Sequence, residues 1–249
     1  MKKLELNAYT LKMIAIIAMI MQHTAMVFRD YLPLQVEVIM HIAGGITFPI
    51  LAYFVTEGYK HTSNFKKYIT RLFIFALIAQ VPFALALGSA VFLQYNILFT
   101  MLLGLLFIQW YEMKKGTMLF YLTIPVFLVA SIFVQFTFIG VLMIFLFHVI
   151  QNEKLRILIP SLLSILFFTH TFEIIPQILN GSFNGINLDF FYYIAMGLGN
   201  IIALCLLYTY NGQRGKSMKY FFYSVYPLHY AVLIAVAYLL GTNLIFYLY

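Results

Sequence analysis

The feature that most constrains this chain is a succession of long apolar runs separated by short polar loops. Of its 249 residues, 63% are hydrophobic and only 9% are charged, a balance that is foreign to soluble globular domains of this length. An apolar run of about 17–25 residues can cross a lipid bilayer as one helix. The sequence therefore predicts an all-α, polytopic integral membrane protein, a helical bundle in contact with membrane lipids.

About nine runs satisfy this length rule. The fifth and sixth are separated only by the stretch "VQFTFIG", so eight spans is the alternative. No repeat of fixed period and no soluble segment interrupts the series, and we therefore expect one domain over residues 1–249. The nine runs cover residues 9–28, 36–56, 67–87, 93–111, 117–132, 135–151, 155–171, 188–209 and 218–240.

The basic residues discriminate between these counts. With nine spans, the loops on one side hold almost every Lys and Arg, whereas the other side holds only Arg29. Because Lys and Arg accumulate in cytoplasmic loops, the amino terminus is predicted to be cytoplasmic and the carboxyl terminus external. Merging the fifth and sixth spans would move the later basic loops outside. Orientation in the bacterial inner (cytoplasmic) membrane also explains the net charge of +7 without a nucleic-acid partner.

Three histidines, His23, His41 and His229, fall within the apolar runs, where an ionisable side chain is costly and suggests function. With a rise of 1.5 Å per residue, His23 lies about 20 Å and His229 about 17 Å from the cytoplasmic ends of their helices. A neutral imidazole can accept and return a proton near neutral pH, so these two are candidate catalytic bases. The alternative is a histidine that bonds to a carbonyl of the next helix and only supports packing.

Two further polar residues are candidates for the same chemistry. In "FFYSVYPLHYAVL", Pro227 leaves a carbonyl one turn back without its helical donor, and Tyr226 flanks this turn. In "YNILFTMLLG", Asn96 and Thr100 share one helix face. Tyr226 and Asn96 are therefore predicted hydrogen-bond donors in a site, although Asn96 would equally suit a bond to an adjacent helix.

The loop "TEGYKHTSNFKKYITR" is the most polar segment of the chain. Positive charge combined with hydroxyl and amide donors at a helix start suits a phosphate group. We therefore predict Glu57, Lys60, Lys67 and Arg71 as cofactor-binding residues. The alternative for the lysines is contact with anionic lipid.

Five motifs, in this order, resemble the TraX-type family, whose namesake is the conjugative pilin N-acetylase. The motifs are "LKMIAIIAMIMQHTA", "FPILAYFVTEGYKHTSNFKKYITRLFIFALIAQVPF", "NILFTMLLGLL", "GVLMIFLF" and "FFYSVYPLHYAVL". The resemblance implies an integral membrane acyltransferase that takes an acyl group from coenzyme A. The positions of this chain that match the family's motifs are His23, Glu57, Arg71, Asn96, Tyr226 and His229.

The expected function is therefore transfer of an acetyl group from acetyl-coenzyme A to an unidentified amine or hydroxyl, with no metal. The acceptor would be a peptide amino terminus such as that of pilin, a lipid or a glycan. Two departures from the family bear on this expectation. Gln22 stands where the family has Asp, and "IAGGITFP" lacks the family's arginine. The alternatives are a degenerate, non-catalytic membrane partner and a proton-coupled transporter, although the latter should show two repeated halves.

Overall fold

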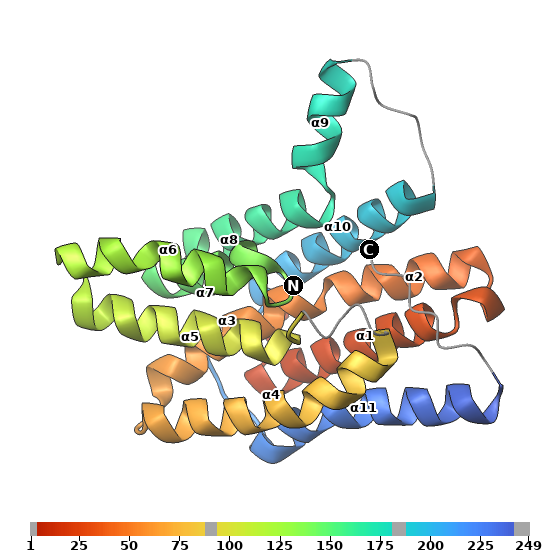
Figure 1. Ribbon diagram of the computed structural model, residues 1–249, viewed down its shortest axis with the longest axis horizontal. Coiled ribbons are helices and arrows are strands. Elements are labelled where there is room, and N and C mark those ends of the chain that lie inside the picture. The colour runs from red at the N-terminus through yellow and green to blue at the C-terminus, as the bar shows by residue number, and fades with distance from the viewer. Residues whose placement is uncertain (1–3, 88–93, 181–187, 242–249) are drawn as a thin grey trace. The chain divides into compact units, whose positions relative to one another are not determined.

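The chain is helical throughout the part that the structure describes. The structure is a computed structural model that describes residues 4–87, 94–180 and 188–241 (Figure 1). Within these residues there are eleven α-helices and one 3-10 helix and no β-strand, which confirms the all-α prediction. The helices are α1 (Ala8–Val27), η1 (Arg29–Tyr31), α2 (Leu34–Gly45), α3 (Thr47–His61), α4 (Phe65–Leu87), α5 (Ile97–Lys114), α6 (Met118–Ile132), α7 (Thr137–Val149), α8 (Glu153–Phe168), α9 (Thr171–Leu179), α10 (Leu188–Leu207) and α11 (Lys219–Leu239).

Each of the nine apolar runs contains a helix, but the helices differ in length. Among the described residues, six helical segments are long and apolar enough to cross a membrane, one of them formed by α2 and α3 together. A seventh results if α8 and α9, which are bent by 57°, form one span. With 15 and 13 residues, α6 and α7 measure about 22 and 20 Å, less than the roughly 30 Å hydrocarbon core. The structure therefore supports six to seven spans, and nine spans with a cytoplasmic amino terminus stay a prediction.

The chain turns back between α6 and α7, which lie side by side (Figure 1). Phe136 has a φ of 61°, in the left-handed region, so the helix cannot continue through it. The Tyr95 backbone N–H donates to the Phe133 carbonyl at 2.6 Å, and the Gln135 N–H donates to the Tyr95 carbonyl at 2.9 Å. These bonds fasten the turn to the segment before α5. The residues of the fifth and sixth runs are therefore two separate helices and not one continuous span.

The helices belong to two compact units, each built from two separate parts of the chain. The first unit comprises residues 1–51 and 151–217, and the second comprises residues 52–150 and 218–249. The first unit holds α1, α2, α8, α9 and α10, whereas the second holds α4 to α7 and α11. Helix α3 begins in the first unit and continues in the second. A single domain over residues 1–249 stays a prediction.

In the second unit, α4 and α11 run parallel to each other. Phe75 of α4 stacks on Tyr223 of α11 with ring centroids 5.2 Å apart, and further along both helices Phe83 meets Tyr230 at 5.9 Å. Because the contacts advance in the same direction on both helices, the helices point the same way. Two membrane helices that point the same way have an odd number of crossings between them. Nine spans leave an odd number there, and the number of spans stays a prediction.

In the first unit, small residues let α2 and α10 cross closely. A side chain added at Gly199 of α10 would collide with backbone atoms around Gly45 of α2, and one added at Gly45 would collide with the Met196 carbonyl. Glycines promote helix packing in membranes by this kind of backbone approach. His41 of α2 also packs against Tyr192 of α10, with ring centroids 4.6 Å apart. His41 and then Gly45 of α2 meet Tyr192 and then Gly199 of α10. Because the order is the same along both helices, α2 and α10 are parallel.

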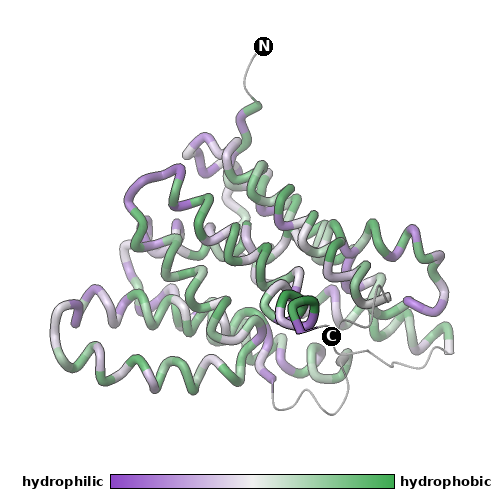
Figure 2. Tube along the Cα trace, turned by 90° about the horizontal axis from the view of Figure 1, so that it is seen from above, coloured by the Kyte–Doolittle hydropathy of each residue, from purple (hydrophilic) through white to green (hydrophobic). Residues whose placement is uncertain are grey.

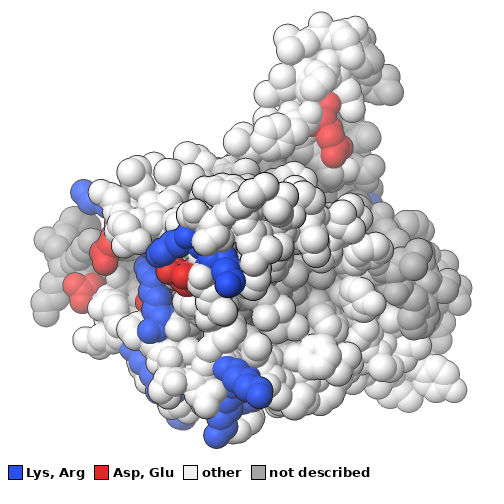
Figure 3. Space-filling model, turned by 60° about the vertical axis from the view of Figure 1, so that its left-hand side comes forward, with Lys and Arg blue, Asp and Glu red and all other residues white. Residues whose placement is uncertain are grey.

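Apolar side chains cover much of the exposed surface. On α4, Leu77, Val81 and Leu85 recur every four residues and are 50%, 63% and 56% exposed. Figure 2 shows mostly hydrophobic residues along the helices and hydrophilic ones toward the turns, and most of the face in Figure 3 carries neither Lys, Arg, Asp nor Glu. Large apolar patches that face outward mark surfaces that contact something other than water. These stripes indicate the lipid-contacting surface of a multi-pass membrane protein.

Candidate functional site

Aromatic rings and a histidine gather on α11 in the second unit. The ring centroids of Tyr226 and His229 are 5.5 Å apart, those of His229 and Tyr230 are 4.2 Å apart, and Tyr226 meets Tyr230 edge to face at 5.6 Å. All three side chains are buried. Tyr230 also contacts Phe83 of α4. The structure thus brings together Tyr226 and His229, which the sequence predicted as catalytic residues.

A backbone carbonyl determines which nitrogen of His229 carries the hydrogen. The Nδ1 atom lies 3.0 Å from the carbonyl oxygen of Val225, one turn earlier on the same helix. Because a carbonyl oxygen can only accept, Nδ1 donates, and the lone pair of the neutral ring is on Nε2. This bond is to its own helix, and the packing alternative, a bond to the next helix, stays a prediction. The ring is therefore oriented with its lone pair on Nε2, the atom that would accept a proton in general-base catalysis.

Asn96 caps α5 and is fully engaged. Its Oδ1 accepts a hydrogen bond from the Leu98 backbone N–H at 3.0 Å, as an N-cap residue does. Its Nδ2 donates to the Ala76 carbonyl and to Gln80 Oε1 of α4, both at 2.9 Å. The side chain is completely buried. Asn96 therefore joins α5 to the adjacent helix, and its role as a catalytic donor stays a prediction that requires one of these bonds to open.

The Tyr226 hydroxyl links the α11 cluster to the start of α5. It faces the side chain of Tyr230 and the backbone of Ile97, the residue after Asn96. Its oxygen is buried and forms no aligned hydrogen bond among the described residues. A buried hydroxyl without a bond costs about 1–3 kcal/mol, and such an atom calls for an explanation in terms of structure or function. Tyr226, His229 and Asn96 thus lie close together in one unit.

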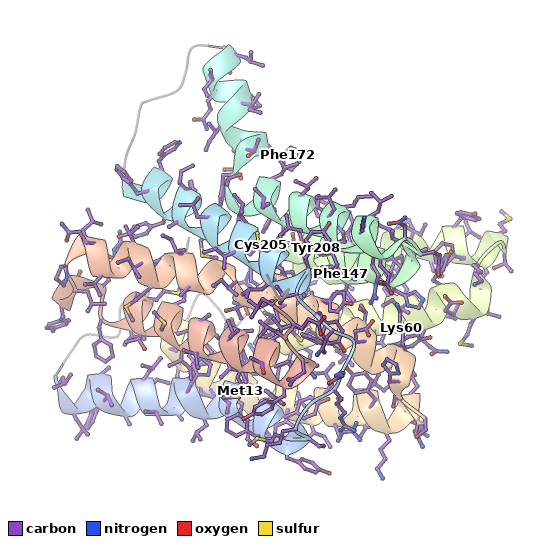
Figure 4. All side chains as sticks on the ribbon, turned by 180° about the vertical axis from the view of Figure 1, so that it is seen from behind. Met13, Lys60, Phe147, Phe172, Cys205 and Tyr208 are labelled. Atoms are coloured by element: carbon purple, nitrogen blue, oxygen red, sulfur yellow. The ribbon has the colours of Figure 1, made fainter. Side chains whose placement is uncertain are left out.

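The predicted cofactor-binding residues begin at the turn between α3 and α4. Glu57 Oε1 lies 3.7 Å from Lys60 Nζ, and Glu57 Oε2 lies 3.7 Å from His61 Nε2. Lys60 stands near the carboxyl end of α3 (Figure 4), and Lys67 is exposed in the first turn of α4. The turn therefore presents ammonium groups to solvent around a single half-buried carboxylate. Such a surface attracts an anion more strongly than the apolar faces around it do.

Arg71 lies further along α4, among tyrosines. Its guanidinium carbon is 6.0 Å from the centroid of the Tyr68 ring, and it faces the Tyr223 hydroxyl of α11. Its Nε is buried and forms no aligned hydrogen bond among the described residues. His229 follows Tyr223 by six residues, about 9 Å along the helix. Arg71 therefore lies on α4, and its Nε–H lacks an aligned acceptor within the described part of the chain. The candidate base, His229, lies on α11, the neighbouring helix of the same unit.

Several polar residues of the structure escaped the sequence-based reasoning. Gln80, which bonds twice to Asn96, is a lone polar residue in the apolar "LIAQVPF", a signal that could have found it. His148 Nε2 lies 2.7 Å from Glu112 Oε1, and neither residue was singled out from the sequence. Because His148 and Glu112 are far apart in the chain, no local sequence pattern indicates that they pair. Arg29 and Glu37 form a further ion pair in the first unit, at 3.2 Å.

Comparison with known proteins places the chain among its relatives. A family model described as "TraX protein" matches residues 7–237, nearly the whole chain. The chain belongs to the TraX family. One relative of this chain, from Dichelobacter nodosus, is described as "Probable fimbrial assembly protein FimC, serogroup H1". It is 27% identical over 253 residues, which cover 93% of this chain and 96% of that protein. No solved structure matches the chain.

The residues in which this TraX-family chain departs from the motifs lie in the first unit. Gln22, in place of the acid, donates to Met196 Sδ of α10 at 3.4 Å and packs on Gly44 of α2. It therefore ties α1 to two other helices. The stretch without the arginine includes Gly45, where α2 crosses α10. His23 follows Gln22 on α1 and is half-buried; it lies in a different unit from His229, and its catalytic role stays a prediction.

Proposed function

We propose that this TraX-family chain is an integral membrane acyltransferase that moves an acetyl group from acetyl-coenzyme A to an amine or hydroxyl. The description of a full-length relative as a probable fimbrial assembly protein favours a protein amine, such as the amino terminus of a fimbrial subunit, over a lipid or a glycan. The observation that carries the proposal is the orientation of His229: Nδ1 bonds to the Val225 carbonyl, and the imidazole ring lies 5.5 Å from the ring of Tyr226, whose hydroxyl is buried.

In the proposed reaction, His229 Nε2 accepts a proton from the acceptor amine as the amine nitrogen attacks the thioester carbonyl carbon. The Tyr226 hydroxyl donates to the oxygen, which becomes negative. When the carbonyl reforms, the carbon–sulfur bond breaks, and the thiolate of coenzyme A leaves and takes the proton from the imidazolium. The products are the acetylated acceptor and coenzyme A with a free thiol, and His229 is neutral again.

The phosphates of the donor would bind near the turn between α3 and α4, which the predicted topology places on the cytoplasmic side. Lys60 and Lys67 attract them at the turn between α3 and α4, and Glu57 holds Lys60 by their ion pair. Arg71 offers a planar guanidinium suited to a phosphate. From there the thioester arm extends along α11 toward His229, about 9 Å beyond Tyr223. Arg71 and His229 thus lie at different positions along the pair formed by α4 and α11.

The first test is thermal unfolding of the detergent-purified protein with acetyl-coenzyme A, with dephospho-coenzyme A as the ligand control. At about a hundred times its dissociation constant a ligand adds about 2.7 kcal/mol of stability, which is roughly 5–10 °C in Tm for a chain of this size. Arg71→Ala should abolish the shift, whereas Lys66→Ala, a neighbouring exposed lysine, and His229→Ala should retain it. Absence of any shift in the wild type would contradict the donor site and favour the non-catalytic alternative.

The second test follows transfer itself. Membranes that contain the protein are incubated with radiolabelled acetyl-coenzyme A, and the label is measured in the protein, lipid and glycan fractions. His229→Ala should lower the transfer rate by roughly 10²–10⁴-fold, the usual contribution of a general base, while acetyl-coenzyme A still stabilises the variant. Transfer at the wild-type rate by His229→Ala would remove this residue from the mechanism.

A further inference from the structure

The first unit contains a buried group of charged and aromatic residues at the Arg29 end of α2. Glu37 is 4% exposed, although it lies in an apolar run, and Arg29 Nε approaches its Oε1 at 3.2 Å. The Arg29 guanidinium carbon also lies 4.9 Å from the centroid of the Tyr192 ring of α10. His41, one turn after Glu37, packs against the Tyr192 ring. A carboxylate and the face of an aromatic ring therefore surround one cation.

This combination is what proteins use to recognise cationic groups. A carboxylate supplies the opposite charge, and an aromatic face within about 6 Å attracts a cation through its quadrupole. An ionised buried carboxylate without a cation is strongly disfavoured, so an ionised Glu37 favours a cation beside it. In the structure, this cation is the chain's own Arg29. Charged residues at membrane depth are rare and mark functional sites by default.

Two observations indicate that Arg29 can be exchanged for another cation. The first is exposure: the Arg29 side chain is 19% exposed and the Glu37 side chain only 5%, so the cation covers the carboxylate on its solvent side. Arg29 is carried by η1, a helix of only three residues, and not by a long helix. The second is alignment: Glu37 Oε1 is buried and accepts no well-aligned hydrogen bond among the described residues, despite the short distance to Arg29.

We propose that the Glu37–Tyr192 site, formed by Glu37, His41 and Tyr192, binds a primary ammonium group in exchange for Arg29. An ammonium group is compact and directs three N–H donors, so it can align with Glu37 Oε1 where the guanidinium does not. On the proposed function, this group is the amino terminus of the acceptor protein, bound as an ammonium group before it loses a proton and reaches the thioester. By the predicted topology the Arg29 end of α2 is external. This site thus recognises the acceptor and belongs to the first unit, whereas the proposed donor site belongs to the second.

The test uses n-butylammonium chloride as the probe and n-butanol as its uncharged control, without acetyl-coenzyme A. At about ten times its dissociation constant, n-butylammonium should raise the Tm of the full-length wild type by roughly 3–6 °C, and n-butanol should not. Arg29→Ala should give a larger shift because it removes the competing cation. Glu37→Gln should give none, and Tyr192→Leu a smaller one. Size-exclusion profiles and helical circular dichroism establish that each variant is folded.

Two outcomes would overturn the proposal. A shift in Arg29→Ala without one in the wild type would show that Arg29 is a permanent occupant, and equal shifts in the wild type and Glu37→Gln would show non-specific binding. The assignment to an amino terminus is tested by competition between two hexapeptides without Lys or Arg, one free and one acetylated at its amino terminus. The free peptide alone should displace n-butylammonium, and equal displacement by both refutes this assignment. Because acetyl-coenzyme A is absent, failure of the donor site leaves these results unaffected.

Discussion

Replacing Asn96 by Ala should destabilise the second unit by more than the loss of a helix cap. The cap to the Leu98 N–H is worth about 1 kcal/mol. The bonds from Nδ2 to the Ala76 carbonyl and to Gln80 Oε1 add about 0.6–1 kcal/mol each, the value for polar contacts between membrane helices. The expected total is about 2–3 kcal/mol, or roughly 4–12 °C in Tm for a chain of this size.

Asn64 provides the matched control, because it caps α4 in the same unit. Its Oδ1 accepts from the Lys67 N–H at 2.8 Å, and it is exposed. Asn64→Ala should therefore lose only the cap, about 1 kcal/mol and roughly 2–4 °C. The assay is thermal unfolding in detergent of both variants beside the wild type, followed by circular dichroism. Equal losses in the two variants would refute the reasoning, because they would mean that the bonds to α4 contribute nothing.

Three further predictions follow from the packing. Gly199→Ala should cost about 1–3 kcal/mol in thermal unfolding, because its new methyl group meets the backbone of α2, whereas Gly197→Ala meets only a side-chain methyl group of Thr169 and should cost less. In a chain without its native cysteine, cysteines placed at Ser63 and Ser217 should react with a membrane-impermeant maleimide from the same side, because α4 and α11 are parallel; labelling from opposite sides would contradict this packing. Removing the exposed Lys115–Glu112 contact by Lys115→Ala should leave the Tm within about 2–4 °C of wild type, since exposed ion pairs contribute at most about 1 kcal/mol.

The helical fold could be predicted from the sequence because lipid imposes one rule on every segment. Backbone groups in a membrane must bond within their own helix, so each apolar run becomes helical whatever its neighbours are. The division into two units could not be predicted, because it depends on which helices pack together. The crossing at Gly45 and Gly199 joins positions more than 150 residues apart, and nothing near either glycine specifies the other.

The site was predictable in part for the same reason. His229 and Tyr226 stand on one helix face, and their proximity follows from the helix period alone. The engagement of Asn96 by Gln80 depends on the packing of α4 against α5, which the sequence does not reveal. The pairs of His148 with Glu112 and of Tyr192 with His41 likewise join separate helices. Polar residues buried in apolar runs are therefore found from sequence more readily than their partners are.

The construction of both units from separate parts of the chain has a consequence for how the protein is made. Helix α4 is synthesised long before α11, the helix that packs along it. Helix α2 is likewise synthesised long before its partner α10. During this interval the earlier helices lack these packing partners: Arg71 lacks Tyr223, and His41 lacks Tyr192. The polar groups of an unfinished chain must meanwhile be accommodated by lipid, water or the insertion machinery. Biogenesis therefore ends with long-range assembly inside the bilayer, and the last third of the polypeptide completes both halves of the molecule.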